Sequence, residues 1–477
     1  MNKVKSIIQL NLSSILRNLF GLIRSKITAL LLGIEGIGVL GQVITFFNVQ
    51  NKIVSFGTDT IIVNRLAKLN EATDKENHDS IVIFSFIFLL LTNLVYITVT
   101  LIFNDRLTIL LFDDIKFKYI TGLIIIVGPL FAISHNFEVL TQSKAKFTYL
   151  AIGRNFGSIL AILLVFPLIF YFHYWGIVLS LYVFVLGSGL YFFFINWDFL
   201  KRIKLYNIKN IYTNINFLLK LGLTDIVRKL LFFLSLLIFR IIIVQKSGIK
   251  VNGLFQAAWS ISAYTEIFIA AFISFYFPVI SNAQNGQTIK KKIQNNLNAL
   301  IYIIFPIIAL IMLLSDFLLF FLYNEAFLQM ELSLRILAYS RFFQAIYLFY
   351  LITLLSQSKL KEFLMGETIR SFSLVISAYI LVPMYSLHGA IISTVISQVL
   401  PLLSVFIMIM KMNDFLPSVK EYKLFFRVSI LLFILLIPYD NNWVFRGILA
   451  ILFISLTFLI IDLNKYKNII ISYLGRK

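Results

Sequence analysis

Long apolar runs repeat along the chain and are separated by short polar breaks. A helix that crosses the bilayer needs about 20 mostly apolar residues, and most of the runs reach roughly this length. The pattern predicts an all-α polytopic membrane protein with 14 transmembrane helices. The predicted helices cover residues 6–32, 37–64, 80–103, 119–141, 147–171, 174–196, 214–244, 251–280, 296–323, 334–356, 362–383, 387–410, 424–438 and 443–462.

Basic residues alternate between the breaks. Every second break is rich in Lys and Arg, and one of these basic breaks includes Arg154. Together they hold about five times as many basic residues as the other breaks. This bias is typical of the cytoplasmic side. With an even number of helices, both termini are then expected in the cytoplasm. The longest outer break, residues 104–118, is too short for an extracytoplasmic domain.

A short internal similarity predicts that the chain is a duplication. Residues 9–19 match residues 220–230 in their polar positions, which places Arg17 on Arg228, and Gln42 falls on Gln256 after a small insertion. Repeats with an even number of helices are parallel and form two lobes. We expect a first lobe in 1–200, a basic cytoplasmic linker in 201–213, a second lobe in 214–412, and two more helices with a cytoplasmic tail in 413–477.

Composition supports a membrane protein and excludes several other classes. The chain is 60% hydrophobic and 13% charged, far from the balance of a soluble domain. Its net charge of +20 would suggest nucleic acid in a soluble protein, but the positive-inside bias explains it, so no nucleic-acid partner is expected. The sequence has no cysteine, four histidines and no Walker loop. No metal site, cofactor or ATP-driven step is therefore expected within this chain.

Arginines in the first apolar run indicate an anionic substrate. A cation at mid-membrane costs at least about 2.5 kcal/mol, so it is expected to face protein or water. Arg17 and Arg24 are seven residues apart and share one helix face. Arg228 is their counterpart in the second half, although its side chain could also reach the inner interface. Since arginine binds phosphate through two parallel hydrogen bonds, we predict that Arg17, Arg24 and Arg228 bind a pyrophosphate.

Three carboxyl groups within the runs are candidates for coupling to a proton or sodium ion. Asp59 and Glu266 have no cation within helical reach, so each would be protonated or face water. Asp225 can pair with Arg228 or Lys229, and a structural ion pair is the alternative for it.

Other polar residues within the runs are expected to contact sugar hydroxyls or to line the passage. Packing between helices would explain the neutral ones equally well. Arg341 and Gln344 are expected to face the interior of the second lobe, and Arg370 to pair with Glu367 three residues earlier. The predicted set is Gln42, Asn48, Gln256, Tyr264, Arg341 and Arg370.

Three segments carry a resemblance to a known family. They are the turn Leu32-Gly33-x-x-Gly36-x-Gly38-x-x-x-Gln42, residues 256–262 (QAAWSIS) and residues 275–281 (FYFPVIS). The chain resembles the O-antigen flippases, which are lipid-linked oligosaccharide transporters of the multidrug/oligosaccharidyl-lipid/polysaccharide exporter (MOP) superfamily. It is similar to the branch of lipid III flippases, which handles enterobacterial common antigen.

The resemblance implies a V-shaped pair of six-helix lobes with two appended helices. It implies a transporter rather than an enzyme, located in the bacterial inner membrane. Its substrate would be an undecaprenyl-pyrophosphate-linked oligosaccharide, moved from the inner to the outer leaflet by alternating access through a cationic cavity and coupled to H⁺ or Na⁺. An O-antigen polymerase and a chain-length regulator are its expected protein partners.

Three other functions remain open on the sequence. A lipid II flippase would use the same pyrophosphate chemistry. A multidrug exporter of the same superfamily would be expected to carry an acidic cavity, whereas the intramembrane charges here lean basic. A membrane O-antigen polymerase or ligase would need a large outer loop, which the breaks do not provide.

Overall fold

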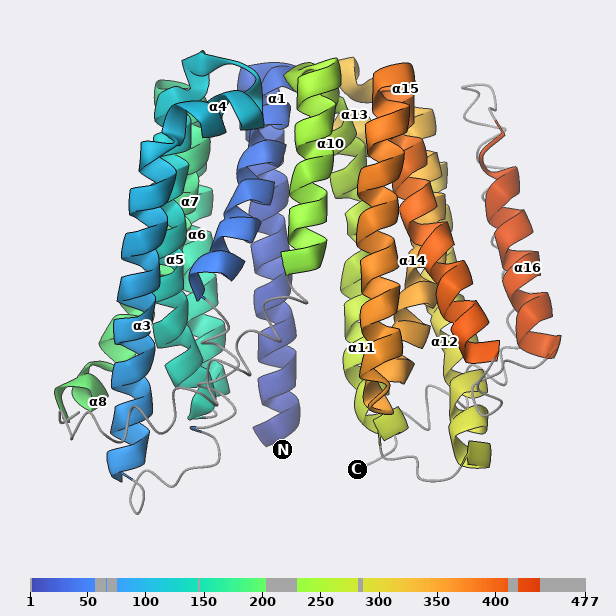
Figure 1. Cartoon of the computed structure of the whole chain (residues 1–477), viewed down its shortest axis with the longest axis horizontal. Helices are drawn as coiled ribbons and strands as arrows, with labels where there is room; N and C mark the ends of the chain where they lie inside the picture. The colour runs from blue at the N-terminus through green and yellow to red at the C-terminus, as the bar shows by residue number, and fades with distance from the viewer. Residues whose placement is uncertain are drawn as a thin grey trace. The chain divides into compact units, whose positions relative to one another are not determined.

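The structure is a computed structural model that describes residues 2–55, 66, 75–144, 146–202, 230–281, 286–410 and 419–437. Every regular element within these residues is a helix (Figure 1), which confirms the all-α class. Ten helical segments of this part of the chain are long and apolar enough to cross a membrane.

Two long helices each contain two predicted spans. α1 (Asn2–Ser55) leaves helical geometry at Gly33, where φ is 62°, and so separates the first predicted span from the second. Glycine adopts a positive φ at little steric cost. α15 (Leu360–Met410) is broken in the same way at Ser386, between predicted spans eleven and twelve.

The other predicted spans correspond to single helices or to two joined helices. The thirteenth is α16 (Val419–Ile434), and the fourteenth, residues 443–462, lies outside the described residues. The remaining long helices are α3 (Lys75–Ile102), α5 (Lys118–Ser143), α6 (Phe147–Phe172), α7 (Tyr174–Ile195), the helix Leu230–Ser247, α10 (Ile249–Ala263), α11 (Thr265–Ser281), α12 (Gly286–Leu313) and α14 (Glu331–Ser356), with a short α8 (Trp197–Arg202) after α7.

The predicted outer break at residues 104–118 contains two short helical pieces. This segment forms α4 (Asn104–Phe112) and a 3-10 turn, η1 (Ile115–Phe117). Likewise, the end of the ninth predicted span is a separate short helix, α13 (Ser315–Leu322), followed by the 3-10 turn η2 (Glu325–Met330). Each piece is too short to show helical periodicity in the sequence.

The turns of the first half recur in the second half, as a duplication requires. The α6–α7 turn has φ 50° at His173, and Ser386 has the same φ at the equivalent turn in α15. Asp114 caps η1 by accepting a hydrogen bond from the backbone N–H of Lys116, and Asn324 caps η2 in the same way. These two matches are what the predicted duplication would produce.

The chain divides into two compact units, Met1–Gly253 and Leu254–Lys477. In the first, α1, α5, α6 and α7 pack together; in the second, α14 packs against α11, α12 and α15, and α16 lies against α12. The division falls inside α10 rather than in the predicted linker 201–213, because the segment 230–253 packs against the first unit and is hydrogen-bonded to it. The lobe boundaries given by the repeat stay a prediction.

The crossing of residues 34–38 with residues 249–253 shows why this segment joins the first unit. A Cβ added to Gly38 would collide with the backbone carbonyl of Ile249, and one added to Gly253 would collide with that of Ile34. Asn252 Nδ2 donates to the carbonyl oxygen of Gly38 over 2.8 Å. The two glycines thus allow the helix backbones to touch.

The outer faces of the helices are apolar. Leu90, Leu94 and Val95 of α3 and Leu163 and Phe166 of α6 are more than half exposed. Such stripes would associate in water, whereas lipid solvates them. Together with the spanning helices, they establish a multi-pass membrane protein.

Candidate functional site

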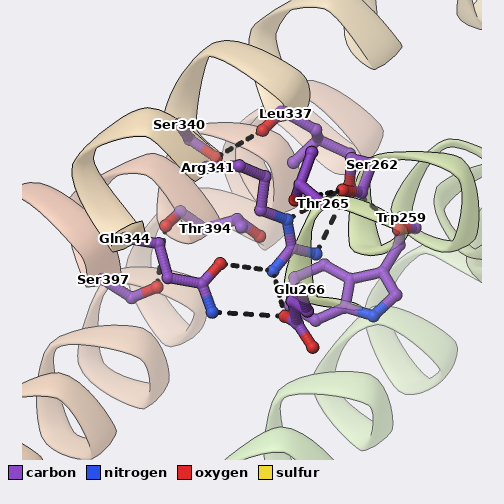
Figure 2. A network of polar contacts seen from close by, with 10 residues as sticks. All are labelled: Trp259, Ser262, Thr265, Glu266, Leu337, Ser340, Arg341, Gln344, Thr394 and Ser397. Carbon is purple, nitrogen blue, oxygen red and sulfur yellow. Dashed lines mark hydrogen bonds and ion pairs between the residues drawn. The ribbon is translucent and has the colours of Figure 1, made fainter. Parts of the chain in front are cut away.

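A buried arginine on α14 organises a polar network in the second unit (Figure 2). The side chain of Arg341 is 1% exposed. Its Nη1 donates to Glu266 Oε1 and to Gln344 Oε1, each over 2.6 Å. Arg341 and Gln344 therefore face the interior of this unit, as the sequence predicted.

The remaining donors of Arg341 are directed at α10. Nε and Nη2 both lie 3.3 Å from Ser262 Oγ, and the guanidinium carbon is 4.3 Å from the centre of the Trp259 ring. An indole face attracts a guanidinium group through its quadrupole. Every nitrogen of the guanidinium group thus has a protein partner.

Glu266 has a cation partner, which corrects the expectation of an unpaired carboxyl group. Its Oε1 accepts from Arg341 and, over 3.2 Å, from Gln344 Nε2. Its side chain is 45% exposed, and Oε2 accepts no hydrogen bond from any residue that the structure describes. The carboxylate therefore keeps one oxygen open beside a fully enclosed cation.

The network lies near the middle of α14. Arg341 follows the first residue of this 26-residue helix by ten positions, or roughly 15 Å at the helical rise per residue. Taking two charges out of water is costly unless both are paired and hydrogen-bonded.

The two arginines of the first span differ in their surroundings. Arg24 is 7% exposed, and its guanidinium carbon lies 5.0 Å from the ring centre of Phe20. Arg17 is exposed and lies within electrostatic range of Arg154 and Glu138. Arg17 forms no hydrogen bond or ion pair with a described residue.

Arg154, Glu138 and His135 form an ionic cluster that the sequence analysis did not identify. Arg154 Nε and Nη2 lie 2.7 and 2.5 Å from Glu138 Oε1, and His135 Nδ1 lies 3.4 Å from Oε2. Glu138 is near the end of α5 and Arg154 near the start of α6. Glu138 lies five residues before the end of α5 and Arg154 seven residues after the start of α6, so no helical spacing in the sequence indicates the pair.

The neutral polar residues predicted to contact sugars have mixed surroundings. Gln42 is fully buried and its Nε2 donates to the carbonyl of Leu111 over 2.7 Å, as a packing role would require. Gln256 Nε2 donates to Ser260 Oγ over 2.7 Å. Asn48 is half-buried on α1, and Tyr264 forms the turn between α10 and α11.

The other predicted site residues are either near an aromatic ring or undescribed. Arg370 on α15 is 7% exposed, with its guanidinium carbon 5.6 Å from the centre of the Tyr347 ring. Asp59, Asp225 and Arg228 lie outside the described residues. No group of three or more His, Asp or Glu side chains is placed to hold a metal ion within the described part of the chain.

The fold is similar to those of several solved membrane transporters. The lipid II flippase MurJ in an inward closed conformation superposes with a TM-score of 0.74 at 17% identity, over 98% of this chain and 100% of that chain. An inward-facing multidrug resistance MATE transporter of the MOP superfamily gives 0.71 at 17% identity, over 86% and 98%. A MOP-superfamily transporter from Pyrococcus furiosus gives 0.59 at 17% identity, over 86% and 96%. At these identities the likeness shows the fold alone.

Residues 4–284, more than half of the chain, match the polysaccharide biosynthesis protein family. The chain belongs to this family. No curated relative matches it.

Proposed function

We propose that this protein moves an undecaprenyl-pyrophosphate-linked oligosaccharide, an O-antigen repeat unit, from the inner to the outer leaflet of the bacterial inner membrane. The observation that carries the proposal is the exposed guanidinium group of Arg17, which has no hydrogen-bond partner among the described residues of a polysaccharide biosynthesis protein. A pyrophosphate crosses hydrocarbon only along a hydrated, cationic path. Arg17 and Arg24, with Arg228 in the second repeat, would provide that path during alternating access.

We assign the sugar contacts to four of the predicted polar residues. Asn48, Gln256, Tyr264 and Arg370 remain candidates. The amide nitrogen of Gln42 already bonds Leu111, and all the guanidinium nitrogens of Arg341 have protein partners. These last two residues would therefore support the site rather than bind the glycan.

We propose that Glu266 couples transport to a proton or sodium gradient. Its open Oε2 can take a proton or bind a cation, and either event weakens its pairing with Arg341. The buried guanidinium group then needs another partner, which favours a rearrangement of α10, α11 and α14. Asp59 and Asp225 are further candidates for coupling. Both termini would lie in the cytoplasm.

A lipid II flippase is the second candidate. MurJ superposes over nearly the full length of this chain, and its substrate, as its name states, is a lipid. A multidrug exporter is less well supported, because the arginines of the first span favour an anion. A polymerase or ligase would need a catalytic outer domain, and the described outer segments are short helices and turns.

The experiment is complementation of a strain that lacks its own O-antigen flippase but makes the cognate lipid-linked unit. Wild-type protein should restore surface display, whereas Arg17→Ala and Arg24→Ala should abolish it while still inserting in the membrane. Lys118→Gln, which removes a cation from an exposed ion pair with Asp105, is the matched control. Normal display in both arginine variants would overturn the role of the cations, and rescue of a strain depleted of MurJ would favour lipid II.

A further inference from the structure

The cluster at the inner end of the first unit holds more positive than negative charge. Arg154 is paired with Glu138, and Arg17 from α1 interacts electrostatically with both. Arg17 lies on α1, which packs against α6, the helix of Arg154. Among the described residues, the two guanidinium groups are matched by one carboxylate, and His135 adds no negative charge. Like charges repel each other, and a membrane-spanning segment gives them little water for screening. An anion from outside the chain would balance them.

The two arginines also have donors to spare. Arg154 spends Nε and Nη2 on a single oxygen of Glu138, while its Nη1 donates to no described residue. The side chain of Arg154 is 24% exposed, so that nitrogen is accessible. Arg17 offers its whole guanidinium group. Two guanidinium groups on helices that pack together suit a ligand with several charged oxygens, such as a diphosphate.

The depth of the cluster places it near the inner surface. Arg154 follows the first residue of α6 by seven positions, roughly 10 Å along the helix. Arg17 precedes the outer turn at Gly33 by 16 positions, roughly 24 Å. With the orientation that the basic breaks predict, both residues lie in the inner half of the bilayer. A lipid headgroup that enters from the inner leaflet would meet them first.

We propose that Arg17 and Arg154 form the loading site for the diphosphate of the lipid-linked substrate, with Glu138 holding Arg154 in position until the diphosphate replaces it. This inference rests on the proposed function. A carboxylate and a phosphate present similar oxygens to the fork of an arginine, so Glu138 occupies the place of a phosphate. His135, on the far side of the carboxylate, gives the displaced Glu138 a partner.

The test is a titration of the purified full-length protein in lipid nanodiscs at low ionic strength. Inorganic pyrophosphate and farnesyl diphosphate serve as probes, and heat of binding is the readout. Wild type should bind both, and Arg17→Gln and Arg154→Gln should each weaken binding by about tenfold or more, the effect of losing a charge-assisted hydrogen bond. Lys118→Gln, far from the cluster in sequence, should bind as wild type does.

Glu138→Gln separates a binding site from a structural ion pair. If Glu138 competes with the ligand, its neutralisation frees Arg154 and should tighten pyrophosphate binding severalfold. If the ion pair of Glu138 and Arg154 only holds α5 and α6 together, Glu138→Gln should instead lower the stability of the protein without raising its affinity for pyrophosphate. The single variant Arg154→Gln could fail to fold because it leaves Glu138 unpaired. In that case the double variant, Arg154→Gln with Glu138→Gln, removes both charges. This double variant should fold but bind pyrophosphate weakly.

Three results would overturn the proposal: no binding by wild type, unchanged binding in Arg154→Gln, or farnesyl diphosphate binding that does not depend on Arg17 and Arg154. The last result would mean that the cluster binds a free anion rather than the headgroup of a lipid. Failure of the proposed function has a different outcome. Diphosphate binding would then follow these arginines, while complementation of O-antigen display fails for wild type.

Discussion

Neutralising Glu266 should destabilise the second unit more than removing Arg341. Glu266→Gln leaves a cation that is 1% exposed without its counter-ion, while Arg341→Met leaves a carboxylate that is 45% exposed and can be hydrated. Breaking a buried pair by removing one partner costs about 3–5 kcal/mol, and we place Glu266→Gln near the lower end because Ser262, Gln344 and Trp259 still contact the cation. For Arg341→Met we expect about 1–2 kcal/mol, the cost of unsatisfied polar groups.

The double variant makes the reasoning testable. Replacing both members of a buried pair by neutral groups of similar size is often close to neutral for stability, so Glu266→Gln with Arg341→Met should recover most of the loss. The assay is denaturant unfolding of the full chain in detergent micelles, with the four proteins forming a double-mutant cycle. A coupling energy near zero, or a Glu266→Gln variant as stable as wild type, would refute the assignment of Glu266 as the counter-ion.

Three further predictions follow from the packing and the charge pattern. Gly38→Ala should lower the free energy of unfolding by about 1–3 kcal/mol, because its methyl group collides with the carbonyl of Ile249, whereas Gly21→Ala, with no atom nearby, should not; thermal unfolding of both variants checks this. Gln42→Leu should leave the carbonyl of Leu111 without its side-chain donor and cost about 1 kcal/mol, and full stability in that variant would exclude the bond. A reporter fused after Lys477 should be cytoplasmic, and a periplasmic signal would contradict the predicted 14 helices.

The spans were predictable because the bilayer sets their length. α14 was predicted as residues 334–356 and is Glu331–Ser356, and α7 was predicted as 174–196 and is Tyr174–Ile195. The burial of Arg341 was also predictable, because lipid excludes a guanidinium group. Both predictions depend on the solvent around the chain rather than on contacts between distant residues.

Partners distant in sequence were not predictable. Glu266 and Arg341 are separated by 75 positions, so no helical spacing could pair them. Gln42 and Leu111 are separated by 69, and a buried amide gives no sign of which carbonyl it will meet. Arg154 was interpreted as one of the basic residues of the inner breaks. Because that interpretation already explains its positive charge, it did not predict an ion pair with Glu138.

The repeats place different chemistry at equivalent positions. Ten residues into α14 is Arg341, whereas ten residues into α5 is Gly128, against which the side chain of Gln50 packs and donates to the carbonyl of Ile125. At this position along the helix the first repeat therefore holds a neutral amide, and its ionic cluster of Arg154 and Glu138 lies closer to the turn between α5 and α6.

This asymmetry suggests that loading of the diphosphate depends on the ionic cluster of the first repeat and ion coupling on Glu266 of the second. The division predicts opposite phenotypes. Glu266→Gln should remove the dependence of transport on the ion gradient while leaving diphosphate affinity unchanged. Arg154→Gln should weaken diphosphate binding while transport, where still measurable, keeps its gradient dependence. If either variant changes both quantities to the same extent, one coupled site rather than two separate ones would account for the charges.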